Sequence, residues 1–100
     1  MTKPVPCNSI EEVRAQIDRI DRSIVALLAE RSVYVHQAAR FKKTADAVRA
    51  PQRVEQVIAK VKTLATEQGA SPEIVEQVYR AMIEAFTQAE LVEHASLQSR

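Results

Sequence analysis

Apolar residues in the first half of the chain recur with the spacing of one long amphipathic helix. Ser9 and Glu12 fit the S-x-x-E capping box, so this helix is expected to begin just after Ser9. The apolar positions that follow, with no Gly or Pro between them, are Val13, Ile17, Ile20, Ile24, Leu27, Leu28, Val35, Ala38 and Phe41. The pattern predicts a helix over about 10–42, preceded by a flexible tail over 1–8.

Two shorter helices are expected after the stretch KKTADAVRA, in which the helical period is lost. Pro51 suits the first turn of a helix and Gly69 suits the position just past its end, which predicts a helix over about 51–68. Pro72 restarts the chain, and the apolar stripe after it predicts a helix over about 72–95. The expected fold is therefore all-α, with three helices, one long and two shorter.

The first of these helices is too long for a compact chain of this size. About 33 residues give a rod of roughly 50 Å, whereas a compact domain of about 100 residues has a radius of gyration of about 13 Å. The two shorter helices of the same chain cannot cover an apolar stripe of that length. We therefore expect one domain over 1–100 that forms an intertwined homodimer. The alternative is a monomeric bundle in which the first helix bends.

Composition and charge narrow the choice of partners. The chain has 14 Lys and Arg against 13 Asp and Glu, so it has no broad basic field, and nucleic acid is not expected to bind. The N-terminus lacks the apolar core of a secretion signal, and no apolar run reaches membrane-spanning length. Because the single cysteine, Cys7, cannot form an internal disulfide, a cytoplasmic location is expected. His36 and His94 lack neighbours at metal-ligand spacing, so no metal site is expected.

One arginine occupies an apolar position of the first helix. Ile10, Ile17 and Ile24 form a column with a seven-residue spacing, Arg31 takes the next place in it, and Ala38 resumes it. A guanidinium at a core-facing position is costly unless an anion meets it. That anion is either an internal carboxylate or a bound small dianion.

Three further cations are candidates for the same site as Arg31. On a helix that continues to position 42, Lys42 projects within about 20° of Arg31, so the two could hold opposite ends of one dianion. Arg14 lies roughly 25 Å from Arg31 along the helix, so it can reach that ligand only from the partner chain. Arg53, near the start of the second helix, adds a cation beside exposed N–H groups. Taken singly, Lys42 could instead extend to water and Arg53 could be surface charge.

Three stretches of the chain follow a familiar pattern: VRAQIDRIDRSIVALLAERSVYV (13–35), ARFK (39–42) and APQRVEQV (50–57). They resemble the all-helical chorismate mutases and their sister enzyme, isochorismate-pyruvate lyase, and the resemblance extends from about Ser9 to about His94. It implies an intertwined dimer with two cationic pockets and a pericyclic reaction that needs no cofactor. No nucleophile–base pattern and no Gly-rich phosphate loop point to another chemistry.

The resemblance also implies a role for each cation. Arg14 of one chain would clamp a substrate carboxylate across the interface, and Arg31 would clamp the other carboxylate. Lys42 would donate to that second carboxylate and to the ether oxygen of the breaking bond, while Arg53 would lie near the pocket mouth. The residues expected to line the pocket are Val35, Ala50, Val54 and Phe86.

A residue of the last helix completes the expected site. The family places there a glutamine that hydrogen-bonds the ether oxygen. The spacing from Tyr79 and Ile83 puts Glu90 at this position, and only a shift of register would put Gln88 there. Fungal-type mutases also carry a glutamate here. Because a carboxyl group donates only when protonated, turnover is expected to fall as the pH rises through the ionisation of Glu90.

These features predict a chorismate mutase that rearranges chorismate to prephenate. Enteric-type mutases carry acidic residues where this chain has Ala50 and Val54, and both departures favour the alternative, an isochorismate-pyruvate lyase that releases salicylate. A third reading, a non-catalytic helical dimer that binds a small anion or serves as an adaptor, does not explain why Arg31 stands in the apolar column. The chain fits either aromatic amino-acid biosynthesis or salicylate biosynthesis of the siderophore type.

Overall fold

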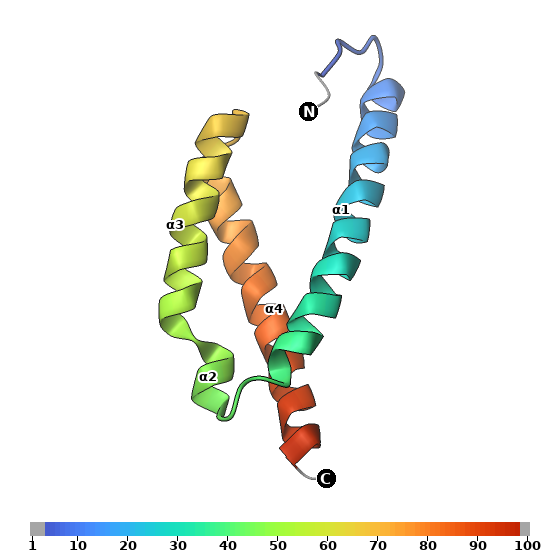
Figure 1. The fold of residues 1–100 in the computed structure, drawn as a ribbon. Coiled ribbons are helices and arrows are strands. Elements are labelled where there is room, and N and C mark those ends of the chain that lie inside the picture. The colour runs from blue at the N-terminus through green and yellow to red at the C-terminus, as the bar shows by residue number, and fades with distance from the viewer. Residues whose placement is uncertain (1–3, 99–100) are drawn as a thin grey trace. The chain divides into compact units, whose positions relative to one another are not determined.

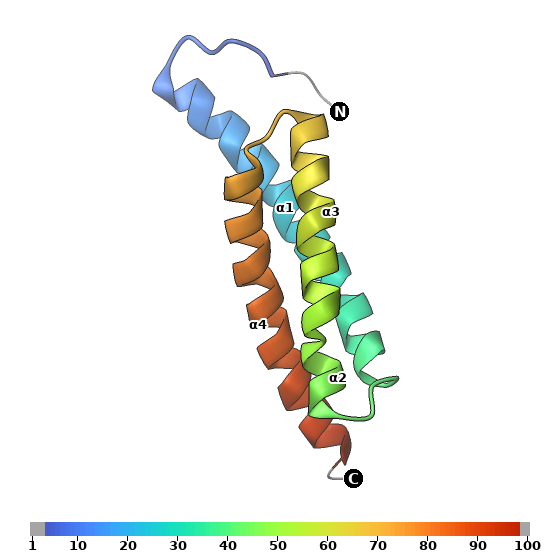
Figure 2. The same ribbon diagram turned by 90° about the vertical axis from the view of Figure 1, so that its left-hand side faces the viewer.

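The structure, a computed structural model that describes residues 4–98, contains four α-helices and no strand within that range. They are α1 (Ile10–Ala39), α2 (Ala45–Arg49), α3 (Pro51–Gln68) and α4 (Pro72–Gln98), as Figures 1 and 2 show. The predicted all-α class is confirmed, and the three predicted helices correspond to α1, α3 and α4. None of the described helices is both long enough and apolar enough to cross a membrane.

Local hydrogen bonds account for the helix ends that the sequence predicted. At the start of α1, the Glu12 amide donates to Ser9 Oγ at 3.1 Å, and the Glu12 carboxylate accepts from the Asn8 amide at 2.7 Å. At the end of α3, Gly69 adopts φ 77°. This lies in the left-handed region, which glycine enters without the steric cost that a Cβ atom brings. These ends are encoded by residues within one turn of each terminus.

The predicted end of the first helix, near position 42, is wrong. The helix ends at Ala39, and the amides of Arg40, Phe41 and Lys42 make tighter i→i−3 bonds of 3.0 to 3.4 Å that close its last turn. Lys42 therefore lies in the loop before α2, and the helical geometry that put it on one face with Arg31 does not apply. The C-terminal helix is longer than predicted and continues to Gln98.

The short helix α2 lies in the stretch where the helical period is lost, and the sequence predicted no helix there. It forms because the Thr44 hydroxyl accepts a hydrogen bond from the Ala47 amide at 3.1 Å and so caps its first turn. Ala50 then adopts φ 39° and ψ 62°, which ends α2 and redirects the chain into α3. A left-handed alanine costs about 1–2 kcal/mol, so the neighbouring helices must hold this junction in place.

The chain divides into two compact units, the described parts of Met1–Val33 and Tyr34–Arg100. In the second unit α3 and α4 lie side by side and α2 packs against α4, as both ribbon views show. Its core consists of small and branched side chains, Ala39, Val48, Ile58, Val61 and Ala65. Two polar residues of α4, Glu90 and His94, are also buried.

The first unit carries most of α1, whose apolar stripe is largely exposed. Ile17 is 50% exposed and Ile24 is 48% exposed. Burying a side chain of this size contributes about 1.5–3 kcal/mol, so a stripe of this kind favours association. The homodimer stays a prediction, and this exposed stripe supports it.

A network of four charged side chains joins α3 to α4. The Arg80 guanidinium donates to both carboxylate oxygens of Glu55, at 2.9 and 3.0 Å, and through Nε to Glu76 at 2.9 Å. Lys62 Nζ lies 3.3 Å from the same Glu76 carboxylate. The hydrogen bond with Arg80 lowers the pKa of Glu55 and of Glu76 below their ordinary value of 4.5, and Lys62 lowers that of Glu76 further.

We expect Arg80→Gln to lower the midpoint of thermal unfolding by a few degrees at neutral pH, and by less at about pH 3. A carboxylate whose pKa is depressed in the folded state stabilises the fold above its unfolded pKa. That contribution is lost as the pH falls through the depressed pKa. Thermal unfolding followed by circular dichroism at both pH values measures the difference. Arg19→Gln is the control, because the one hydrogen bond of the Arg19 side chain within residues 4–98 is to Gln16 on its own helix. An Arg80→Gln effect independent of pH would contradict the network.

Candidate functional site

Lys42 and Glu90 form an ion pair between the loop after α1 and helix α4. Lys42 Nζ lies 2.7 Å from Glu90 Oε2, and the two side chains are 27% and 6% exposed. Apart from this ion pair, Oε2 has no hydrogen-bond partner among the described residues. A buried carboxylate that retains hydrogen-bonding capacity is a place where a ligand can gain a polar contact.

His94 contacts the backbone of the same lysine. Its Nε2 atom lies 3.1 Å from the Lys42 carbonyl oxygen, and the residue is 8% exposed. Glu90 and His94 are four residues apart, so α4 presents both on one face. Sequence reasoning considered His94 only as a metal ligand; its i, i+4 spacing from Glu90 is the signal that could have drawn attention to it. Among residues 4–98, no group of three or more His, Cys, Asp or Glu side chains could hold a metal ion.

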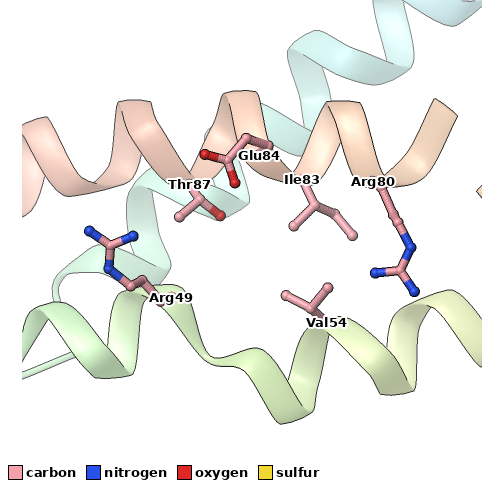
Figure 3. Close-up of a pocket in the computed structure, with 6 residues that line it drawn as sticks. All are labelled: Arg49, Val54, Arg80, Ile83, Glu84 and Thr87. Carbon is pink, nitrogen blue, oxygen red and sulfur yellow. The ribbon is translucent and has the colours of Figure 1, made fainter. Parts of the chain in front are cut away.

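A pocket of about 260 Å³ lies between α2, α3 and α4 (Figure 3). In Figure 3 Val54 and Ile83 face each other across its middle, and the guanidinium groups of Arg49 and Arg80 lie at opposite ends. Glu84 and Thr87 complete the lining. An apolar middle with cations at its ends suits a small molecule that has an apolar body and anionic groups.

The pocket and the ion pair share a face of α4. Ile83 and Thr87 line the pocket, and Glu90 follows three residues after Thr87. Spacings of four and three residues place these side chains in one row along the helix. Arg49 makes no ion pair with a described residue, whereas Arg80 is held by Glu55 and Glu76. Arg49 is therefore the cation of this pocket whose charge is open to a ligand.

Of the other residues predicted to line the pocket, the structure places only one there. Val54 lines the pocket, as expected, whereas Val35, Ala50 and Phe86 are half-buried and are not among its lining residues. Arg53 is exposed at the start of α3, next to Val54. The pocket residues that the sequence reasoning missed are Arg49, Arg80, Ile83, Glu84 and Thr87.

The two cations of the first unit lie on α1. Arg14 is exposed and Arg31 is half-buried. Intermediate burial of a guanidinium agrees with its place in the apolar column next to solvent-exposed neighbours. Their roles toward a ligand stay predictions.

Two comparisons with known proteins bear on this arrangement. Residues 13–91 match the family model for chorismate mutase type II. The chain is also 36% identical over 83 residues to the isochorismate pyruvate lyase of Pseudomonas aeruginosa, an alignment that covers 83% of this chain and 82% of that protein. The matched range includes every predicted site residue from Arg14 to Glu90.

Proposed function

Because the chain belongs to the chorismate mutase type II family, we propose that it is a chorismate mutase that rearranges chorismate to prephenate. The observation that carries the proposal is the buried Glu90 beside Lys42, on the α4 face that also lines the pocket. This pairing brings a cationic donor and a carboxyl group to one point of the fold. Such a point suits a reaction in which charge develops on one oxygen of a small dianion.

The reaction needs no group to be transferred to or from the protein. In a Claisen rearrangement the ether C–O bond breaks while a C–C bond forms within the same molecule, and negative charge develops on the ether oxygen. The protein must hold the substrate in its folded diaxial shape and stabilise that charge. Lys42 would donate to a substrate carboxylate and to the ether oxygen, and Glu90, when protonated, would donate to the same oxygen.

The remaining cations would come from α1 of both chains. Arg31 would bind one carboxylate of the dianion, and Arg14 of the partner would bind the other. The exposed apolar stripe of α1 supports a homodimer in which a second copy covers it. Each dimer would then hold two equivalent sites.

Isochorismate pyruvate lyase activity is the second candidate, and a specific observation favours it. Val54, an apolar residue, faces Ile83 in the pocket, and Ala50 precedes α3. Neither side chain can accept a hydrogen bond from a ring hydroxyl. The 36% identity to the Pseudomonas aeruginosa lyase points the same way.

One experiment separates these activities. The protein is incubated with chorismate and with isochorismate in separate reactions, and prephenate and salicylate are quantified in each. We expect prephenate from chorismate at a rate well above the reaction without protein. Salicylate formed from isochorismate with the higher kcat/KM would identify a lyase instead, and no turnover of either compound would leave a non-catalytic anion-binding protein.

The proposed donor role of Glu90 predicts a pH profile. Only a protonated carboxyl group can donate to the ether oxygen, whereas an amide donates at any pH. Glu90→Gln keeps a donor that does not ionise, so its kcat should vary less than about threefold with pH. The measurement is kcat from pH 5 to about pH 9 for both proteins. A profile left unchanged by the substitution would remove Glu90 from the chemistry.

A further inference from the structure

Lys42 lies outside regular secondary structure. Helix α1 ends at Ala39, and the Lys42 amide makes only a long turn bond of 3.4 Å to the Ala39 carbonyl. Its neighbour Phe41 is 83% exposed, so apolar packing contributes little to holding this part of the loop. The next fixed point along the chain is Thr44, which caps α2. The position of Lys42 therefore depends on contacts that come from elsewhere in the fold.

Those contacts come from two residues of α4, one helical turn apart. Glu90 meets the side-chain ammonium at 2.7 Å, and His94 meets the backbone carbonyl at 3.1 Å. A carbonyl oxygen only accepts, so His94 Nε2 carries the hydrogen of this bond in the neutral and in the protonated ring alike. One contact sets the direction of the side chain, and the other sets the location of the backbone from which it starts.

The end of α1 is tied to α4 near the same point. His36 Nδ1 lies 4.0 Å from a carboxylate oxygen of Glu93, the residue before His94. This contact is long and exposed, whereas His94 is buried. The bond from His94 is thus the well-shielded connection between α4 and the loop backbone.

We propose that His94 is a positioning residue, which fixes the ammonium of Lys42 by donating a hydrogen bond to the Lys42 backbone carbonyl. Its kinetic consequence rests on the proposed function, which places Lys42 against the substrate. The anchoring itself involves no substrate and can be tested without one. Without this bond the backbone of the loop can move, although the ion pair with Glu90 remains. The Lys42 ammonium then occupies several positions and not one. Misplacement by about 1 Å can cost on the order of 10²-fold in rate.

Two substitutions separate the hydrogen bond from the shape of the ring. His94→Phe keeps a ring of similar size without a donor, whereas His94→Gln keeps an N–H donor near the position of Nε2. We expect His94→Phe to lower kcat about tenfold with a smaller change in KM, and His94→Gln to recover most of that loss. Activity of His94→Phe within about twofold of wild type would overturn the proposal.

A double-mutant cycle distinguishes positioning from a structural role. In a Lys42→Ala background there is no ammonium to place, so His94→Phe should change the residual kcat less than about twofold. The same loss in both backgrounds would show that His94 acts through general stability, and it would overturn the proposal.

Backbone hydrogen exchange tests the anchor in the full chain without substrate. The amides of Lys42, Lys43 and Thr44 should exchange about tenfold faster in His94→Phe than in wild type or His94→Gln. Amides in the middle of α3 provide the internal control and should not change. If His94→Phe does not fold, His94→Asn replaces it, since its shorter amide cannot reach the carbonyl. Unchanged exchange in the loop would overturn the anchoring, even if neither chorismate nor isochorismate proved to be a substrate.

Discussion

Replacing Lys42 with alanine is expected to lower kcat by about 10²-fold or more. This is the scale for losing one preorganised donor to a charge that develops in the transition state. Lys42 Nζ sits beside a carboxylate that is 6% exposed, so its position is set before a ligand arrives. Steady-state kinetics with chorismate, or with isochorismate if that is the better substrate, measures the effect.

The control for this substitution is the neighbouring lysine. Lys43 is exposed in the same loop and forms no ion pair with a described residue, so Lys43→Ala should keep kcat within about threefold of wild type. Lys42→Ala also leaves the Glu90 carboxylate without its cation, which should destabilise the fold by about 1–3 kcal/mol. Assays must therefore be run below the measured unfolding midpoint. A loss in kcat under about threefold would contradict the role proposed for Lys42.

Mixing two inactive variants should restore activity if Arg14 comes from the partner chain. Arg14→Ala and Lys42→Ala would each disable both sites of their own homodimer. A heterodimer of the two carries one site with both changes and one site with neither. Refolding them together in equal amounts makes about half of the dimers heterodimers, so about a quarter of the wild-type activity should return.

A second mixture provides the matched control. Lys42 and Glu90 meet within one chain, so a heterodimer of Lys42→Ala and Glu90→Ala, which has no donor at position 90, contains no intact site. That mixture should show no more activity than its components refolded separately. If the Arg14→Ala mixture behaves in the same way, Arg14 either acts within its own chain or takes no part in the reaction.

Much of the fold could be predicted from short-range features. The capping pair Ser9 and Glu12 marked the start of α1, and Gly69 marked the end of α3, because both act on amide and carbonyl groups within one turn. The end of α1 was predicted three residues too late. Apolar spacing continues through Phe41, although this side chain is 83% exposed and so has no packing that would extend the helix.

Less of the candidate site could be predicted. Lys42 and Glu90 were identified by their resemblance to a family pattern. Lys42 does not share a helix face with Arg31, because α1 ends at Ala39 and does not reach position 42. The pocket residues Arg49 and Thr87 carry no recognisable motif. Nothing in their local sequence distinguishes them from surface positions of ordinary helices.

By itself, the sequence determined the helical class of the chain, the starts of its three long helices, the end of α3 and the apolar stripe of α1, since periodicity and capping act between residues a few positions apart. Only the tertiary structure decided that Glu90 and His94 hold one loop residue from α4, and that Val54 faces Ile83 in a pocket. These contacts join residues about 30 to 50 positions apart. They depend on how the helices pack against one another. The free energy of that packing comes from side chains throughout the core, so the local sequence around either residue does not predict the contact.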